Sequence, residues 1–297
     1  MKLDGLLTEQ SNPASAGIDA LPTIDVLAII NDEDRRVAAA VASEISQITD
    51  AVDRIVDHIR VGGRLFYIGA GTSGRLGVLD AAECSPTFQV PVDLVQGIIA
   101  GGEPALAHAS EASEDDPEVG RRDLIARGFS AKDVLVGIAA SGRTPYVLGA
   151  VEEANRLGAL TVGISCTPDS PLSHLVNIAI TPLTGPEVIA GSTRMKAGTA
   201  TKLVLNMIST AVMIRLGYVY GNLMVNVQPR NTKLQDRARR IIAASAAVNY
   251  ERASGLLDEA GGDVRVAILM ARLALDRGTA EARLTASGGR LSEALKS

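Results

Sequence analysis

Aromatic side chains make up only 3% of this 297-residue sequence, and tryptophan is absent. Proteins that bind single-stranded nucleic acid stack bases on aromatic rings, so this composition disfavours that function. The formal net charge of −5 also disfavours broad contact with a phosphate backbone. We therefore expect no nucleic-acid partner, while a single local phosphate site remains compatible with these values.

Metal-binding and disulfide-forming residues are scarce as well. The two cysteines, Cys84 and Cys166, lie far apart, and three histidines are scattered along the chain. Neither a disulfide framework nor the ligand spacing of a zinc site can be built from them. We expect no metal and no disulfide.

Long apolar runs are missing too. The most apolar stretch, 207–216, is interrupted by Ser209, Thr210 and Arg215, and it is too short and too polar to span a bilayer. The first ten residues lack the apolar stretch of a signal peptide. With 46% apolar residues the chain can still bury a sizeable core, so we expect a cytoplasmic globular protein without a membrane partner.

The pattern of apolar residues predicts an α/β fold. Spacings of three and four over residues 33–60 predict one long amphipathic helix, ended by Gly62-Gly63. Short apolar runs then alternate with helical stretches, which is typical of a parallel sheet covered on both faces. The expected strands are 65–68, 92–95, 134–138, 160–164 and 178–180, and a further helix is expected from about 192 to 216.

Three parts of the chain follow from this pattern. Residues 1–60 form an amino-terminal segment with the long helix, and residues 61–225 form the α/β domain. Residues 226–297 are rich in Ala and Arg and form a small helical appendage, with breaks expected at Gly255, Gly261-Gly262 and Gly288-Gly289.

The strongest chemical signal is the glycine-rich stretch 69–77, GAGTSGRLG, between the first strand and a helix. Glycines such as Gly71 let backbone N–H groups approach an anion, and a helix amino terminus favours negative charge. The hydroxyls of Thr72 and Ser73 suit a terminal phosphate. A dinucleotide is the main rival, but it calls for an acid at the end of the second strand, where we expect Gln96-Gly97. The sequence also lacks the G-K-[ST] of a nucleotide P-loop.

Two further segments supply polar groups at predicted helix starts. Ser141, Gly142, Arg143 and Thr144 follow the third strand, although Thr144 could serve only as a helix cap. The stretch 185–199 contributes Glu187, Ser192, Thr193 and Lys196. Cations oppose the dipole at a helix start, so either a bound anion or a nearby glutamate is expected there.

Longer segments of the sequence match one family. YIGAGTSGRLGVLDAAECSPTF, EASEDD, AASGRTPYV and GPEVIAGSTRMKAGTATKLVLNMIST resemble, in this order, the N-acetylmuramic acid 6-phosphate etherases. That family is built on the SIS (sugar isomerase) domain and is related to the glucokinase regulatory protein. TEQSNPAS and IINDED near the amino terminus fit as well, whereas Ser85 departs from the proline that the family favours.

The resemblance implies an SIS-type doubly wound sheet and a reaction that the residues alone do not reveal. The lactyl ether at C3 of the phosphosugar is eliminated and water is added, without a cofactor. By motif matching, Glu83 is the acid that protonates the departing lactate oxygen, and Glu114 is the base that removes the C2 proton. The family also implies a homodimer.

Two other functions stay open from the sequence. A phosphosugar sensor would share the phosphate loops without needing Glu83 and Glu114, and a sugar-phosphate isomerase would share the C2 proton abstraction without releasing lactate. The presence of both acids favours the etherase.

Overall fold

The computed structural model describes residues 7–108, 113–227, 229 and 231–296, and it divides into two compact units. Unit 1 comprises the described residues up to Ala82 together with Val92–Ser209, and unit 2 comprises Glu83–Pro91 and the described residues from Thr210 onward. The elements before the carboxy-terminal helices, in chain order, are η1 (Leu7–Glu9), η2 (Pro13–Ser15), η3 (Ile18–Ala20), α1 (Thr23–Asp34), α2 (Val37–Ala42), α3 (Ile45–Arg60), β1 (Leu65–Gly69), α4 (Gly71–Phe88), β2 (Val95–Ile99), α5 (Pro104–Ala107), α6 (Pro117–Ala126), β3 (Val134–Ile138), α7 (Pro145–Arg156), β4 (Leu160–Ile164), α8 (Pro171–Leu175), β5 (Ile178–Ile180) and α9 (Lys196–Leu216).

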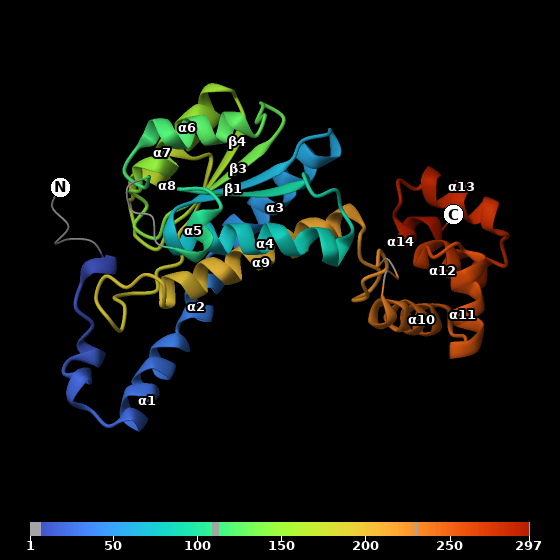
Figure 1. Cartoon of the computed structure of the whole chain (residues 1–297), viewed down its shortest axis with the longest axis horizontal. Helices are drawn as coiled ribbons and strands as arrows, with labels where there is room; N and C mark the ends of the chain where they lie inside the picture. The colour runs from blue at the N-terminus through green and yellow to red at the C-terminus, as the bar shows by residue number, and fades with distance from the viewer. Residues whose placement is uncertain (1–6, 109–112, 228, 230, 297) are drawn as a thin grey trace. The chain divides into compact units, whose positions relative to one another are not determined.

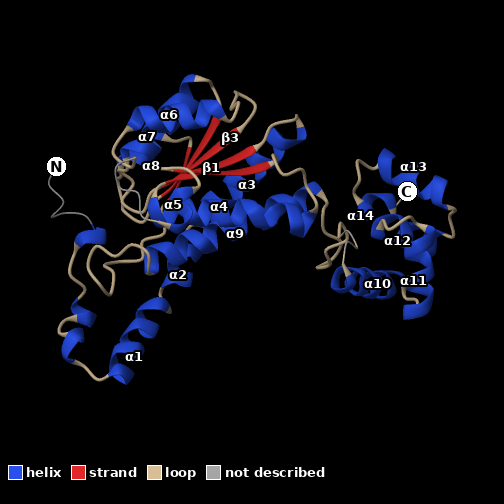
Figure 2. Cartoon of the chain, viewed as in Figure 1, coloured by secondary structure: helices blue, strands red, loops and turns tan. Residues whose placement is uncertain are grey.

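The five strands form one parallel sheet, as the sequence predicts, and the structure shows their order to be β2-β1-β3-β4-β5. Figures 1 and 2 show α6, α7 and α8 on one face of the sheet and α3, α4 and α9 on the other. The central strands β1, β3 and β4 are buried along their whole length, which explains their continuous apolar runs. Since parallel strands all end at the same edge, the loops that follow them gather there.

The two faces of the sheet are filled by alternate residues of each strand. Phe66 and Leu135 belong to the cluster that packs under α6 and α7. On the other face, a Cβ placed on Gly77 of α4 would lie 2.9 Å from the Cβ of Tyr67, so α4 rests directly on β1. This close approach fixes the direction in which α4 leaves the glycine-rich loop after β1.

Several predicted element boundaries are wrong. The helix expected over 33–60 is three helices, with breaks at the polar pairs Arg35-Arg36 and Ser43-Glu44. The Ser43 hydroxyl donates to the Ala40 carbonyl, which competes with continued helix formation. The last helix of the unit begins at Lys196 rather than near Ser192.

The second strand runs over Val95–Ile99, not 92–95, so Gln96 and Gly97 lie inside it. Gly97 is needed there because a Cβ would lie 2.5 Å from the Cα of Val78 on α4. The residues that follow the strand end are Ala100, Gly101 and Gly102. The end of β2 therefore still lacks the adjacent acid that a dinucleotide site calls for.

Helix α9 is the one helix of the described chain that is long and apolar enough to cross a membrane by length and composition alone. More than half of its most apolar window is buried inside the protein. Burial of this kind is what the central helix of a globular domain shows.

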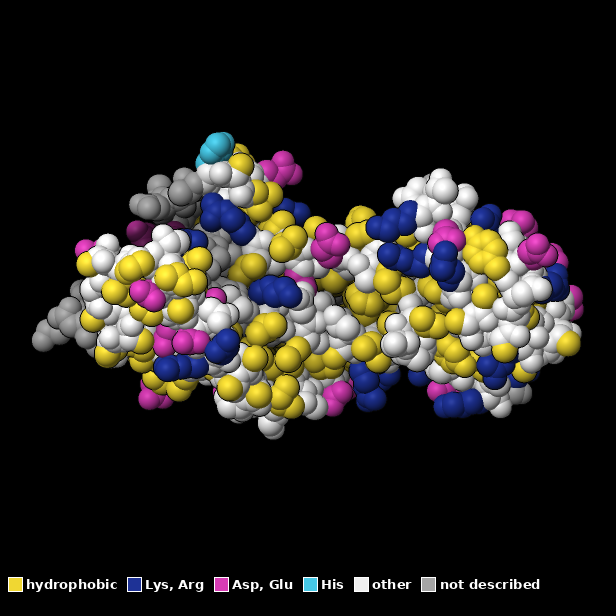
Figure 3. All heavy atoms as spheres, turned by 90° about the horizontal axis from the view of Figure 1, so that it is seen from below, with side chains coloured by type: hydrophobic (Ala, Val, Ile, Leu, Met, Phe, Trp, Pro, Cys, Tyr) yellow, Lys and Arg dark blue, Asp and Glu magenta, His cyan; other side chains and the backbone are white. Residues whose placement is uncertain are grey.

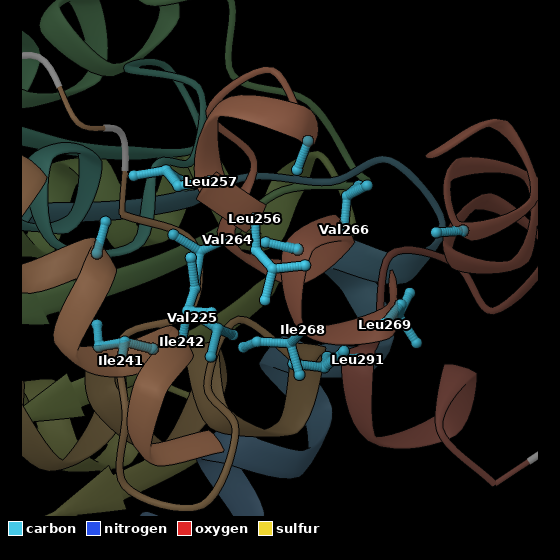
Figure 4. Packing of buried hydrophobic residues seen from close by; sticks show 14 of the residues in the cluster. Val225, Ile241, Ile242, Leu256, Leu257, Val264, Val266, Ile268, Leu269 and Leu291 are labelled. Atoms are coloured by element: carbon cyan, nitrogen blue, oxygen red, sulfur yellow. The ribbon is translucent and has the colours of Figure 1, made fainter. Parts of the chain in front are cut away.

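Unit 2 contains the carboxy-terminal helices α10 (Thr232–Ala246), α11 (Tyr250–Glu259), α12 (Val264–Leu273), α13 (Arg277–Ala286) and α14 (Leu291–Ala294). The side chains of Val225, Ile242, Leu256 and Ile268 converge in a core of their own (Figure 4). The four longer helices are capped by the residues that precede them, Asn231, Asn249, Asp263 and Asp276, whose side chains accept hydrogen bonds from N–H groups of the first turn. The break expected at Gly255 is wrong, because α11 continues through it.

Candidate functional site

The first loop of the candidate site joins β1 to α4 and is closed by glycines. A Cβ on Gly74 would lie 2.6 Å from both the Gly69 carbonyl oxygen and the Ile99 side chain. Gly71 has φ +52°, in the left-handed region. The turn therefore brings the backbone of Thr72 and Ser73 to the amino terminus of an 18-residue helix, where N–H groups and the dipole favour an anion.

The second loop, Ser141–Thr144, joins β3 to α7. Gly142 has φ +64°, and a Cβ there would lie 2.2 Å from the Ser170 hydroxyl, so the loop fits closely against the next one. The Thr144 side chain makes no capping hydrogen bond, which excludes the simple cap role that the sequence left open. The buried Nε of Arg143 has no hydrogen-bond partner in the described part of the chain. Both groups are thus available to a ligand.

Glu114 is joined to this second loop through its backbone. Its carbonyl oxygen accepts the Tyr146 N–H at 3.1 Å, in the first turn of α7. Asp116, two residues on, caps α6 by accepting from the Glu118 and Val119 N–H groups, so this nearby acid has a structural role. Glu111 of the same acidic motif lies outside the described residues. A cavity of about 470 Å³ adjoins this segment, with Ser113 in its wall.

The third segment, 185–196, runs from β5 to the start of α9. The Glu187 carboxylate is buried and accepts the N–H groups of Lys196 and Ala197, each at 2.9 Å. The Lys196 ammonium is also buried, and it lies 2.5 Å from Glu33. The carboxylates of Glu187 and Glu33 therefore explain why a lysine can stand at the start of α9. Ser192 and Thr193 are half-buried at the turn before the helix.

Close contacts bring the three segments together at the carboxyl edge of the sheet. A Cβ on Gly198 of α9 would lie 3.5 Å from the Thr72 side chain, so the first and third segments adjoin. Cys166, after β4, bonds through its N–H to Ala140 and through its thiol to the Ala197 carbonyl, which connects the second and third segments. Burial and the charge of Glu187 raise the pKa of the Cys166 thiol to about 12, so it is not a nucleophile at neutral pH.

Glu83 is exposed on α4, twelve residues after Gly71. That separation corresponds to about 18 Å along a helix axis. Glu83 also falls in unit 2, whereas the three segments and Glu114 fall in unit 1. The structure thus joins the three segments and the Glu114 backbone within unit 1, whereas Glu83 belongs to unit 2.

The sequence-based prediction missed two residues beside this site, Asn12 and Glu33. Both contact the third segment, and Glu33 is 163 residues away from Lys196 along the chain. No local pattern could have linked positions so far apart. The only signal was that TEQSNPAS and IINDED, which contain them, fit the family.

Comparison with known proteins places the chain in a family. Residues 47–155 match the glucokinase regulatory protein N-terminal SIS domain, and residues 114–211 match the SIS domain. The chain is 50% identical over 296 residues to N-acetylmuramic acid 6-phosphate etherase of Caldanaerobacter subterraneus, covering 100% of this chain and 97% of that one. It is 53% identical over 270 residues to the etherase of Photorhabdus laumondii, covering 91% and 90%.

Solved structures support the fold. A phosphoheptose isomerase from Francisella tularensis superposes with a TM-score of 0.53 at 18% identity, covering 65% of this chain and all of that one. The corresponding enzyme from Neisseria gonorrhoeae gives 0.51 at 16% identity, covering 64% and 99%. The sheet, its loops and the full-length identity agree, and the chain therefore belongs to the N-acetylmuramic acid 6-phosphate etherase family.

Proposed function

We propose that this protein cleaves the lactyl ether of N-acetylmuramic acid 6-phosphate, giving N-acetylglucosamine 6-phosphate and D-lactate. The observation that carries the proposal is identity of about half over the full length of relatives bearing that name. Such cleavage serves the breakdown or recycling of cell-wall amino sugars. The predicted setting is the cytoplasm.

Phosphate binding is the first step of the proposed mechanism. Gly71, Thr72 and Ser73 offer N–H and hydroxyl donors at the start of α4, and Ser141, Gly142, Arg143 and Thr144 line the neighbouring loop. We assign Ser192 and Thr193 to the same ligand, with Glu187 and Lys196 at the base of their turn. Holding a non-reacting phosphate lets the sugar carbons be oriented before the reaction begins.

Elimination is the second step. With C1 as an open-chain aldehyde, the C2 proton is acidic, and Glu114 removes it as a carboxylate. Glu83, as the protonated acid, donates a proton to the lactate oxygen as the C3–O bond breaks, because an ether oxygen is otherwise a poor leaving group. Each positioned acid or base contributes about 10²–10⁴-fold to the rate.

Addition of water completes the reaction. The unsaturated aldehyde takes up water at C3 and a proton at C2, which gives N-acetylglucosamine 6-phosphate. Only protons and water are exchanged, so the proposal calls for no metal or redox cofactor. The partner it requires is the phosphosugar alone.

Isotopic labelling tests this route. In water enriched in ¹⁸O, the label should enter the C3 hydroxyl of the sugar and not the released lactate. Label in lactate would show that its own carbon–oxygen bond breaks, and would contradict the elimination. A sensor or an isomerase would release no lactate at all.

We also propose a homodimer. Large apolar side chains on and near α1, Leu21, Ile24 and Leu27, are exposed, with Ile24 at 74%. Figure 3 shows hydrophobic side chains at the molecular surface among charged ones. Exposed apolar groups of this kind commonly mark protein contacts. A second copy would also supply a second Glu83.

A further inference from the structure

An amino-terminal arm, residues 7–36, lies against the segment that carries Ser192 and Thr193. The Thr8 carbonyl accepts the Gly191 N–H at 3.0 Å, and the Ser15 hydroxyl donates to the Val188 carbonyl at 2.7 Å. The arm precedes residue 47, where the first family-domain match begins. It therefore adds to the SIS domain a set of contacts that follow one loop of the site.

The centre of this contact is a buried ion pair. The Lys196 and Glu33 side chains are 2% and 3% exposed, and their charged atoms lie 2.5 Å apart. Asn12 donates to the same Glu33 oxygen at 2.8 Å and to the Pro186 carbonyl at 3.1 Å, while Arg36 lies 3.0 Å from the other oxygen. A buried charge is costly unless it is paired and hydrogen-bonded, so these groups fix one another in place.

The ionised state of Glu33 agrees with this geometry. Burial by itself would raise the pKa of its carboxyl, but hydrogen bonds from Lys196 and Asn12 hold that pKa below the ordinary value of 4.5. The Glu33 carboxyl is therefore ionised at neutral pH.

The ion pair is connected to the candidate ligand site through Lys196. The Lys196 backbone N–H is held by Glu187, and the helix that begins at Lys196 passes Thr72 of the first phosphate loop at Gly198. Gly185 and Gly191, at the two sides of the turn, have φ of +74° and +78°. A turn with such glycines is intrinsically adaptable, so contacts from outside it select its conformation.

We propose that Glu33 is a positioning residue for the phosphosugar site, acting through Lys196 to hold the turn that presents Ser192 and Thr193. The inference rests on the proposed function and adds the amino-terminal arm to it. Glu33 does not meet the substrate. Because the turn grips a non-reacting part of the ligand, its displacement weakens binding more than it slows the chemical steps.

The test compares E33Q with D133N. Asp133 is a matched control, since it is 2% exposed and ion-paired with Arg64 but lies at the amino end of β3, away from the loops. Both variants should lower Tm. Only E33Q should raise KM for N-acetylmuramic acid 6-phosphate, about tenfold, with kcat changed by less than about threefold. A lower Tm with unchanged KM in E33Q would overturn the proposal.

A double-mutant cycle tests whether Glu33 acts through Lys196. The KM of E33Q/K196M should be no higher than that of K196M alone, because the two residues act as one unit. Additive effects would show that Glu33 acts independently of Lys196, against the proposal. If E33Q does not fold, N12A provides a milder loss of the same contact and should also raise KM, whereas an unchanged KM in it would count against the role.

Binding of N-acetylglucosamine 6-phosphate, measured by calorimetry, separates this inference from the proposed function. A wild-type protein that binds this ligand but releases no lactate would refute the function alone. The dissociation constant of E33Q should still be about tenfold weaker than that of the wild type. Equal constants would refute the positioning role.

Discussion

Single side chains decide the chemistry, and Glu114 is the candidate base. Its backbone is tied to the start of α7, beside Ser141–Thr144. We expect Glu114→Gln to lose exchange of the substrate C2 proton in deuterated water by at least about 10²-fold, since an amide cannot act as the base. Proton exchange followed by NMR measures this directly.

Asp115→Asn is the control for that variant, because Asp115 is the exposed neighbour in the same segment. It should exchange the C2 proton as the wild type does. Normal exchange in Glu114→Gln would remove Glu114 from the role of base.

The buried carboxylate of Asp133 should make the free energy of unfolding depend on pH. Burial alone would raise the pKa of Asp133, but hydrogen bonds from Arg64 and Ser130 hold it below the ordinary value of 3.8. When the pKa of a carboxyl is lower in the folded protein than in the unfolded chain, the ionised group stabilises the fold at pH values above the unfolded-state pKa. This contribution is lost as the pH falls through the folded-state pKa. Asp133→Asn should therefore cost about 1–3 kcal/mol of unfolding free energy at pH 7, because it removes the acceptor of several hydrogen bonds.

Urea unfolding at two pH values checks this prediction. The difference between wild type and Asp133→Asn should shrink when the pH is lowered below about 4, where the unfolded carboxyl takes up a proton. A difference that stayed constant down to pH 3 would mean that the ion pair is not its source.

At the scale of elements, the turn between β1 and α4 depends on glycine. A methyl group on Gly74 would meet the Gly69 carbonyl and Ile99 at 2.6 Å, so Gly74→Ala must push α4 away from the strand. We expect a loss of about 1–3 kcal/mol in stability together with a raised KM, as for other overpacked sites. Thermal unfolding and steady-state kinetics on one preparation measure both.

Gly255→Ala is the matched control. Gly255 lies inside α11, and a Cβ there would meet only the ends of the Arg252 and Glu259 side chains, at 3.7 Å. Alanine should stabilise that helix by up to about 1 kcal/mol and leave KM unchanged. An unaltered KM in Gly74→Ala would separate this turn from ligand binding.

The sequence predicted most elements of the sheet because their signals are local. Short apolar runs identified β1, β3, β4 and β5, and the glycine pattern identified the start of α4. Boundaries failed where a tertiary contact decides them. Gly97 looked like a strand end but is an interior residue that lets α4 approach, and the breaks around 35–36 and 43–44 fall at polar positions that the apolar spacing does not register.

For the candidate site too, the sequence supported predictions only where the signals are local. Local motifs identified the three loops, and the family resemblance supplied the roles of Glu83 and Glu114, which remain predictions. The partner of Lys196 was not predictable, because Glu33 reaches it only through the fold. For Thr144 the sequence left open whether the hydroxyl caps α7. The structure shows that it makes no capping hydrogen bond.

At the scale of the whole molecule, the proposed homodimer leads to the prediction that the site is shared between subunits, with Glu83 and Glu114 supplied by different chains. Glu83 lies on α4, three helical turns beyond the glycine-rich loop that opens this helix. Glu83→Gln and Glu114→Gln should each release almost no lactate alone. When the two are unfolded and refolded together, hybrid twofold dimers should recover about a quarter of wild-type activity, because half the dimers carry one intact site.

Refolding each variant separately is the control, and it should restore nothing. No recovery in the mixture, despite hybrid dimers seen by native mass spectrometry, would indicate that both acids act within one chain.

The central claim is that this chain is an active etherase. Its most direct test is to incubate the purified protein with N-acetylmuramic acid 6-phosphate and to quantify D-lactate with a lactate dehydrogenase assay. We predict D-lactate and N-acetylglucosamine 6-phosphate in equal amounts. Binding of the phosphosugar without any release of lactate would contradict the claim and leave a sensor in its place.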